Sequence, residues 1–194
     1  MRLISLRRVH ATTAEFSDEA LLAALTLGDS AAMGALIDRF HQSVYRFVSR
    51  LVGSDAGDRD DLVQATFAEI AICAARYKRI SSVKVWIFGI AANLVRKHMR
   101  SAVRRRRMES ALSSLPPHRA SRPDVEAQDH EMMAQLAAAL AALPAPLREV
   151  FVLCDLEELP CREAAFALGV REGTIWRRLH DARSALRAAL ERVT

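Results

Sequence analysis

Apolar residues recur three and four positions apart along most of this 194-residue chain, which is the spacing of one face of an α-helix. Serine, aspartate and glycine stand at the breaks in this pattern, where they favour the ends of helices. In the first half of the chain the pattern predicts a bundle of four helices, which begin near residues 17, 29, 58 and 83.

The pattern is interrupted between residues 108 and 130, where proline, serine and acidic residues cluster. Helical spacing resumes at residue 131 and breaks again at Pro144-Ala-Pro146. A structureless insert of this length is rare inside a compact domain. We therefore expect an all-α chain with a disordered lead-in at 1–16, two small helical domains at 17–107 and 131–194, and a flexible linker between them at 108–130.

Residues 161–180 have the spacing of a helix-turn-helix. Ala165 is small enough for two helices to approach closely, and Gly169, four residues later, permits the left-handed backbone of a tight turn. A plain helical hairpin in an all-α core is the alternative interpretation. In a DNA-binding motif, the second helix and the residues entering it would present five side chains to phosphates and base edges: Arg171, Thr174, Trp176, Arg177 and Arg178.

Two charged stretches lie in the expected N-terminal domain of a chain whose net charge is +5. The third helix is acidic, which suits docking onto a basic protein surface but also fits a solvated face with acids near the helix N-terminus. Residues 96–107 carry seven positive charges and no acid, a density that favours contact with a phosphate backbone. Upstream, Tyr77 precedes two basic residues, a combination that can hold an unstacked base. Trp86 is in phase with the apolar stripe and is better explained as a core residue.

Other functional classes find little support in the sequence. Cys73, Cys154 and Cys161 show no CxxC spacing and lie in apolar, helical contexts, so we expect reduced thiols that pack as small core residues in the cytoplasm. The chain has no apolar run of about 18 residues, so no membrane span is expected. Its N-terminus lacks the apolar segment of a signal peptide. Nucleotide-binding and HExxH motifs are absent, so we expect neither an enzyme nor a metal or cofactor site.

Three segments resemble a known family. Asp60-Asp-Leu-Val-Gln-Ala-Thr-Phe67 is similar to the helix with which bacterial extracytoplasmic-function sigma factors bind core RNA polymerase, typically Glu-Asp-Leu-Val-Gln-Glu-Thr-Phe. Val85-Trp86-Ile87 and Asn93-Leu94 resemble the promoter-melting helix that follows. Residues 173–180 resemble the C-terminal core Gly-Thr-Val-Lys-Ser-Arg-Leu-His, and the whole resemblance covers 18–102 and 131–191 in the family's order.

The resemblance implies a promoter-specificity subunit whose partners are core RNA polymerase, promoter DNA and an anti-sigma factor, with no cofactor or small-molecule substrate. It implies that core polymerase is bound through Asp60, Asp61, Leu62, Gln64 and Phe67. It implies that the minus-ten element is bound through Tyr77, Lys78, Arg79, Ser81, Ser82, Asn93, Arg96, Lys97 and Arg100. The minus-thirty-five element would be read by the five helix-turn-helix residues named above.

Several positions depart from the family's usual residues. Ala65 stands in place of a glutamate, Lys97 in place of a frequent aspartate, and Trp176-Arg177 in place of Lys-Ser. The last departure lies on the expected reading face, so the promoter sequence cannot be transferred from relatives. A free-standing helix-turn-helix regulator with an N-terminal effector or dimerisation domain is the alternative function, but it leaves the acidic third helix and the basic fourth helix unexplained.

Overall fold

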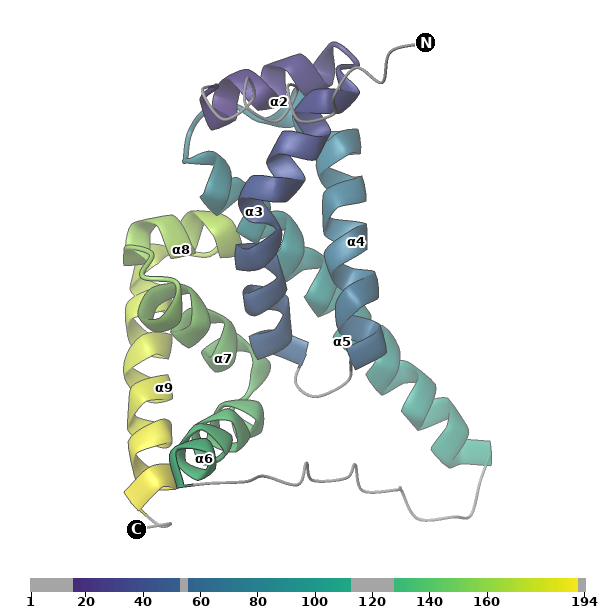
Figure 1. Ribbon diagram of the computed structural model, residues 1–194. Coiled ribbons are helices and arrows are strands. Elements are labelled where there is room, and N and C mark those ends of the chain that lie inside the picture. The colour runs from purple at the N-terminus through teal and green to yellow at the C-terminus, as the bar shows by residue number, and fades with distance from the viewer. Residues whose placement is uncertain (1–15, 53–55, 113–127, 192–194) are drawn as a thin grey trace.

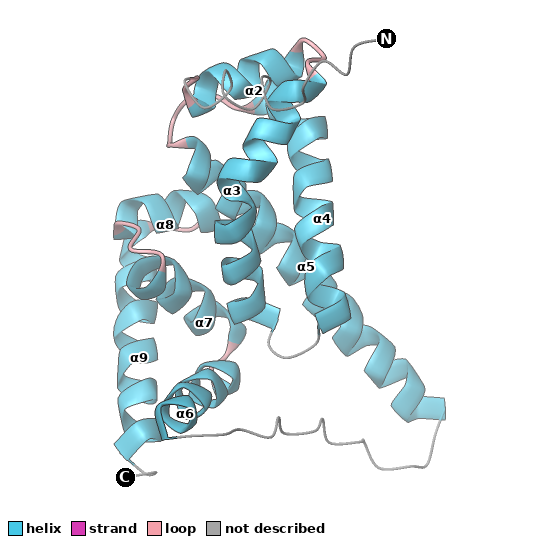
Figure 2. Cartoon of the chain, in the orientation of Figure 1, coloured by secondary structure: helices cyan, strands magenta, loops and turns pink. Residues whose placement is uncertain are grey.

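The computed structural model describes residues 16–52, 56–112 and 128–191, and every regular element within them is helical (Figures 1 and 2). The expected all-α class is therefore confirmed. In chain order the elements are α2 (Asp18–Thr26), α3 (Ser30–Val52), α4 (Ala56–Cys73), the 3-10 turn η1 (Ala74–Arg76), α5 (Val83–Leu112), α6 (Gln128–Ala142), α7 (Ala145–Phe151), the π-helical turn η2 (Val152–Leu156), α8 (Cys161–Leu168) and α9 (Glu172–Glu191).

Helices extend into both ends of the stretch that was expected to be a linker. α5 continues to Leu112, because the residues after Arg107 include good helix formers, and α6 already begins at Gln128. The centre of the expected linker and residues 1–15 of the expected lead-in lie outside the described residues. The proposed boundaries at residues 108 and 130 therefore fall inside helices.

The N-terminal unit is a bundle in which α3, α4 and α5 pack around a common core. Its centre is an aromatic pair: Phe47 of α3 and Phe88 of α5 are fully buried, and their ring centroids lie 4.8 Å apart. Val44, Phe47, Val48 and Leu51 are spaced three and four residues apart and present one buried face of α3.

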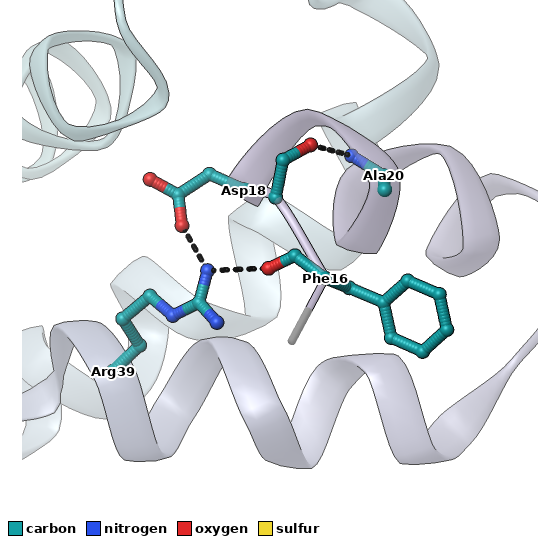
Figure 3. A network of polar contacts seen from close by, with 5 residues as sticks. Phe16, Asp18, Ala20 and Arg39 are labelled. Atoms are coloured by element: carbon teal, nitrogen blue, oxygen red, sulfur yellow. Dashed lines mark hydrogen bonds and ion pairs between the residues drawn. The ribbon is translucent and has the colours of Figure 1, made fainter. Parts of the chain in front are cut away.

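The first helix lies across one end of this bundle (Figure 1). Ser17 Oγ accepts a hydrogen bond from the backbone N–H of Ala20 at 3.2 Å and so caps α2. The guanidinium of Arg39 on α3 pairs with the Asp18 carboxylate and donates to the carbonyl oxygen of Phe16 at 3.1 Å (Figure 3). These contacts fasten the start of α2 to α3.

The C-terminal unit consists of α6 to α9. A stripe of buried residues on α9, spaced three and four apart, faces α7 and α8: Ile175, Leu179, Ala182 and Leu186. The turn between α8 and α9 depends on Gly169, whose backbone adopts the left-handed conformation at φ 66°. The backbone N–H of Val170 then bonds to the carbonyl oxygen of Ala165 at 3.1 Å and closes the end of α8.

The two units pack against each other, a contact that the sequence analysis did not anticipate. α5 lies against α8, while α3 lies against α6, α7 and η2 (Figure 1). The two units approach closely at Gly89, where a Cβ atom would lie 3.0 Å from the carbonyl oxygen of Ala167. Glycine at position 89 therefore permits α5 to lie directly on α8.

Candidate polymerase-binding and promoter-binding surfaces

The predicted polymerase-binding residues on α4 divide into two groups. Asp60, Asp61 and Gln64 are exposed. Leu62 and Phe67 are only 7% and 5% exposed, because they belong to the apolar stripe that holds α4 in the bundle. Of the five predicted residues, the three polar ones are open to a partner, while Leu62 and Phe67 are largely covered by the bundle.

An exposed apolar residue extends this surface toward the end of α4. Ile72 is 71% exposed, while its neighbour Cys73 is buried. Sequence reasoning missed Ile72, because one more isoleucine in a helical apolar segment looks like a core residue. Ile72 is out of helical phase with the buried positions Phe67 and Ile70 of the same helix. This difference in phase is the signal that could have identified it as exposed.

The loop 77–82 is held from within by Tyr77. Its hydroxyl donates to the carbonyl oxygen of Ser81 at 2.6 Å, and its ring lies 5.5 Å from that of the half-buried Trp86. Burial raises the pKa of Tyr77, and the carboxylate of Glu19 adds to the effect. Tyr77 therefore shapes the loop, while the neighbouring basic side chains of Lys78 and Arg79 are exposed.

Two residues of this loop have defined backbone roles. Arg79 adopts a left-handed conformation at φ 56°, which turns the chain and points two successive basic residues outward. Ser82 Oγ accepts a hydrogen bond from the backbone N–H of Val85 at 3.3 Å and caps the start of α5. Of the two predicted serines, Ser82 thus has a structural role, and Ser81 holds Tyr77 through its carbonyl group.

One face of α5 carries the remaining predicted minus-ten residues. Asn93, Lys97 and Arg100 are exposed, and the Arg96 guanidinium donates to Asn93 Oδ1 at 2.7 Å. The end of α5 extends beyond the bundle (Figure 1), and the arginines whose side chains are described there, Arg104, Arg105 and Arg107, are all exposed. These exposed arginines and Lys97 make the second half of α5 strongly basic.

The geometry of α8, the Gly169 turn and α9 is that of a helix-turn-helix. Ala165 is buried at the crossing, as its size predicts. Of the five predicted reading residues, Arg171, Trp176 and Arg177 are exposed, and Thr174 and Arg178 are partly buried. The indole of Trp176 is 57% exposed, and its N–H donates to Glu172 Oε1 at 3.4 Å. An exposed tryptophan beside arginines offers an apolar plane for stacking or methyl contact.

Charged residues meet between the two units. Glu149 of α7 is only 5% exposed; burial raises the pKa of its carboxyl, and the nearby guanidinium groups of Arg96, Arg178 and Arg148 partly oppose this. The Arg96 Nε atom lies 3.7 Å from Glu149 Oε1. A cavity of about 260 Å³ next to this pair is lined in part by Arg96, Arg100 and Arg178. Residues predicted to contact the minus-ten and minus-thirty-five elements thus lie close together.

Two further interactions hold the units together. The guanidinium of Arg148 donates to the carbonyl oxygen of Leu51, at the end of α3, at 2.7 Å. Arg50 Nη1 lies 2.7 Å from Glu157 Oε1, and Glu157 is 7% exposed. Sequence reasoning missed these residues, because a single sequence does not show which groups meet across 97 and 107 positions.

Comparison with known proteins identifies both units. The model of "Sigma-70 region 2" matches residues 36–105, and the model of "Sigma-70, region 4" matches residues 133–186. The ECF RNA polymerase sigma factor SigC of Mycobacterium tuberculosis is 34% identical over 183 residues, which is 92% of this chain and 96% of that protein. SigE of Mycolicibacterium smegmatis is 35% identical over 82% of this chain and 63% of its own length.

Solved structures agree in fold. CnrH, in complex with the cytosolic domain of CnrY, has a TM-score of 0.67 and 25% identity over 91% of this chain and 99% of that one. The sigma factor RpoE of Bartonella quintana, in complex with the anti-sigma factor NepR, has a TM-score of 0.64 and 24% identity over 80% of this chain and 94% of that one. Within the described residues, no helix has the length and apolarity to cross a bilayer. The two matched regions, in this order, and the SigC relative show that the chain belongs to the extracytoplasmic-function group of RNA polymerase sigma factors.

Proposed function

We propose that this chain binds core RNA polymerase, recognises the minus-ten and minus-thirty-five elements of promoters, and thereby initiates transcription in the cytoplasm. The observation that carries this proposal is the order of the two sigma-70 regions, 2 and then 4, each with an exposed charged surface suited to its partner. The chain acts through binding energy and not through covalent chemistry, so it needs no catalytic residue, metal or cofactor.

The outer face of α4 is the proposed polymerase contact. Asp60, Asp61 and Gln64 offer negative and polar groups to a basic partner surface, where charge sets the register and speeds association. Ile72 adds exposed apolar area on the same helix. Leu62 and Phe67 support this face from inside the bundle.

Promoter duplex is the proposed ligand of α9. The exposed side chains of Arg171 and Arg177 reach phosphates or guanine edges, and Trp176 supplies the apolar contact. The proposed ligand of the loop 77–82 and of α5 is the minus-ten element, whose bases unstack during melting. Binding of an unpaired base offsets an unstacking cost of a few kcal/mol.

The two DNA surfaces act together because they belong to one chain. Once the C-terminal unit holds the duplex, the N-terminal unit meets the minus-ten element at a raised effective concentration. In the packed arrangement, Arg96 is occupied by Glu149 and by the carbonyl oxygen of Leu168 at 3.5 Å. We therefore propose that the two units separate when the chain binds polymerase and promoter.

An anti-sigma protein is a further proposed partner. The similar RpoE structure is a complex with the anti-sigma factor NepR, and the CnrH structure is a complex with the cytosolic domain of CnrY. These relatives support the proposal that a protein inhibitor holds this chain as well.

Retention on immobilised core RNA polymerase tests the proposal. We expect the parent chain to be retained, and the double variant Asp61→Ala, Gln64→Ala to bind at least roughly tenfold more weakly. Gln42→Ala is the matched control, because Gln42 is likewise an exposed glutamine but belongs to α3, outside the predicted polymerase-binding residues. Failure of the parent chain to bind, together with tight binding to a palindromic duplex without polymerase, would favour the stand-alone regulator instead.

A further inference from the structure

The cavity beside Glu149 lies between the two units and takes its walls from both. The N-terminal unit contributes the end of α3 and part of α5, and the C-terminal unit contributes the start of α7, Val170 after α8, and Arg178 of α9. Its volume is about 260 Å³. Sites for small ligands occur preferentially at such junctions between domains. A molecule bound in this cavity would therefore contact both units at once.

The polar part of the cavity wall is strongly basic. A single carboxyl group, that of Glu149, lies in the wall together with the guanidinium groups of Arg96, Arg100, Arg148 and Arg178. Burial raises the pKa of Glu149, so folding disfavours this negative charge. The wall therefore carries an excess of positive charge, which favours an anionic ligand.

Arg148 is a buried cation in this wall whose hydrogen bonding is incomplete. It is only 9% exposed, and its terminal nitrogens donate to backbone carbonyl oxygens, among them those of Leu51 at 2.7 Å and Leu143 at 3.0 Å. Its Nε atom is buried without a hydrogen-bond partner. Burial lowers the pKa of Arg148, and the charge of Glu149 only partly opposes this. Because a buried charge is costly without a counter-charge, an anion in the cavity would stabilise the guanidinium.

The rest of the wall is apolar and sets the size of the ligand. Its apolar side chains are Leu51, Val95, Met99, Ala145, Pro146 and Val170. An apolar cavity of about 150 Å³ holds one benzene ring, so this larger cavity accommodates an apolar body of roughly ten carbon atoms. The sugar-phosphate backbone of DNA has no such body, so the apolar wall favours a small amphipathic molecule over promoter DNA.

We propose that this cavity binds a small organic anion, with a carboxylate among the arginines and an apolar body of about two fused rings against the aliphatic wall. A carboxylate suits this place because guanidinium groups bind it through two parallel hydrogen bonds. The bound molecule contacts both units, so it shifts the chain toward the packed arrangement. It also occupies Arg96, Arg100 and Arg178, and so keeps them from DNA. This inhibitory effect rests on the proposed DNA contacts of these residues, whereas ligand binding does not.

Isothermal titration calorimetry of the full chain with 2-naphthoate tests the binding. This probe joins two fused rings to one carboxylate, and 2-naphthamide has nearly the same shape without the charge. We expect one saturable site per chain and at least about tenfold weaker binding of the amide, because its hydrogen bonds are not charge-assisted. The proposal is overturned if 2-naphthoate shows no saturable binding, or if the amide binds equally well.

Charge variants locate the site. The double variant Arg100→Gln, Arg178→Gln should bind 2-naphthoate at least about tenfold more weakly than the parent. The matched control is Arg171→Gln, Arg177→Gln, which removes the same charge from exposed residues outside the cavity wall and should change the affinity by less than about twofold. Equal affinities of the two double variants would place the ligand elsewhere and overturn the proposal.

The methyl resonances of methionine locate the ligand without a substitution. Met99 lines the cavity, whereas Met33 of α3 lies outside its wall. In the parent chain, the Met99 resonance should shift along the calorimetric binding curve, and the Met33 resonance should remain in place. A Met99 resonance that does not respond to saturating 2-naphthoate contradicts binding in this cavity.

Run-off transcription separates ligand binding from its consequence. Saturating 2-naphthoate should reduce transcripts that depend on this chain severalfold relative to 2-naphthamide, while transcripts directed by another sigma factor should be unchanged. Undiminished transcription at saturating ligand would overturn the inhibitory effect. Absence of chain-dependent transcripts without ligand would instead contradict the proposed function, while calorimetry still decides whether the cavity binds the anion.

Discussion

Arg96 and Glu149 show how single residues couple the two units of this sigma factor. Glu149 is almost fully buried, yet the opposing effect of three nearby arginines on its pKa is smaller than the effect of burial. A raised pKa means that folding disfavours the charged form of this carboxyl relative to its form in water. The contact therefore specifies how the units fit together more than it stabilises them.

The raised pKa of Glu149 predicts a pH-dependent difference between the parent and Glu149→Gln. The folded state binds this proton more tightly than the unfolded state, so the contribution of Glu149 to stability is greatest below the ordinary glutamate range. It is lost as the pH rises from that range through the raised value. We expect urea unfolding to show that the parent gains stability relative to Glu149→Gln as the pH is lowered through this window. A stability difference that is independent of pH would contradict this assignment.

Substitutions at buried and at exposed positions of α4 should differ in their effect on stability. Phe67→Ala should destabilise the protein by about 3–5 kcal/mol, because the ring is buried in the core and its removal leaves a cavity. Gln64→Ala should change the free energy of unfolding by no more than about 0.5 kcal/mol, because Gln64 is exposed. Denaturant unfolding of the two variants is the measurement. A mild effect of Phe67→Ala on the free energy of unfolding would contradict the assignment of Phe67 to the core.

At the scale of elements, α9 has one face packed in the core and one exposed face predicted to contact DNA. Ile175 and Leu179 fix α9 in the C-terminal unit, while Trp176 and Arg177 project outward. Periodicity alone predicted this division, because one face of α9 is apolar at helical spacing. The support and the specificity of the motif can therefore be changed separately.

Replacing Trp176-Arg177 with Lys-Ser should change promoter preference without changing polymerase binding. Each lost base contact is worth about 1–3 kcal/mol of discrimination. Selection of bound sequences from a randomised minus-thirty-five region by the holoenzyme, compared with the parent, measures this shift. An unchanged sequence preference would place the reading face elsewhere on α9.

At the scale of the whole molecule, the sequence predicted the helices, their order, the Gly169 turn and the exposed basic residues. Each of these follows from local spacing and local backbone preference. It did not separate the supporting role of Leu62 in the apolar stripe of α4 from the polymerase contact that the resemblance implied, because a family motif does not distinguish residues that touch a partner from those that support them. Nor did it predict the contact of Arg148 with Leu51, because such pairing depends on three-dimensional packing.

The packing of the two units should respond to a single methyl group. Gly89→Ala places a Cβ 3.0 Å from the Ala167 carbonyl oxygen, and such overpacking typically costs about 1–3 kcal/mol. Gly34→Ala is the matched control, because that α3 position has free space and alanine there should stabilise the helix by up to about 1 kcal/mol. Small-angle X-ray scattering should show a larger radius of gyration for Gly89→Ala only. An unchanged radius for both variants would show that the contact tolerates the methyl group.

Promoter-dependent initiation is the central claim, and run-off transcription tests it most directly. The chain would be added to core RNA polymerase with a pool of fragments that carry randomised promoter elements, and the products would be sequenced. The account predicts discrete transcripts that require the chain and whose templates share a minus-ten and a minus-thirty-five element at fixed spacing. Absence of chain-dependent transcripts, with core polymerase shown to be active by another sigma factor, would contradict it.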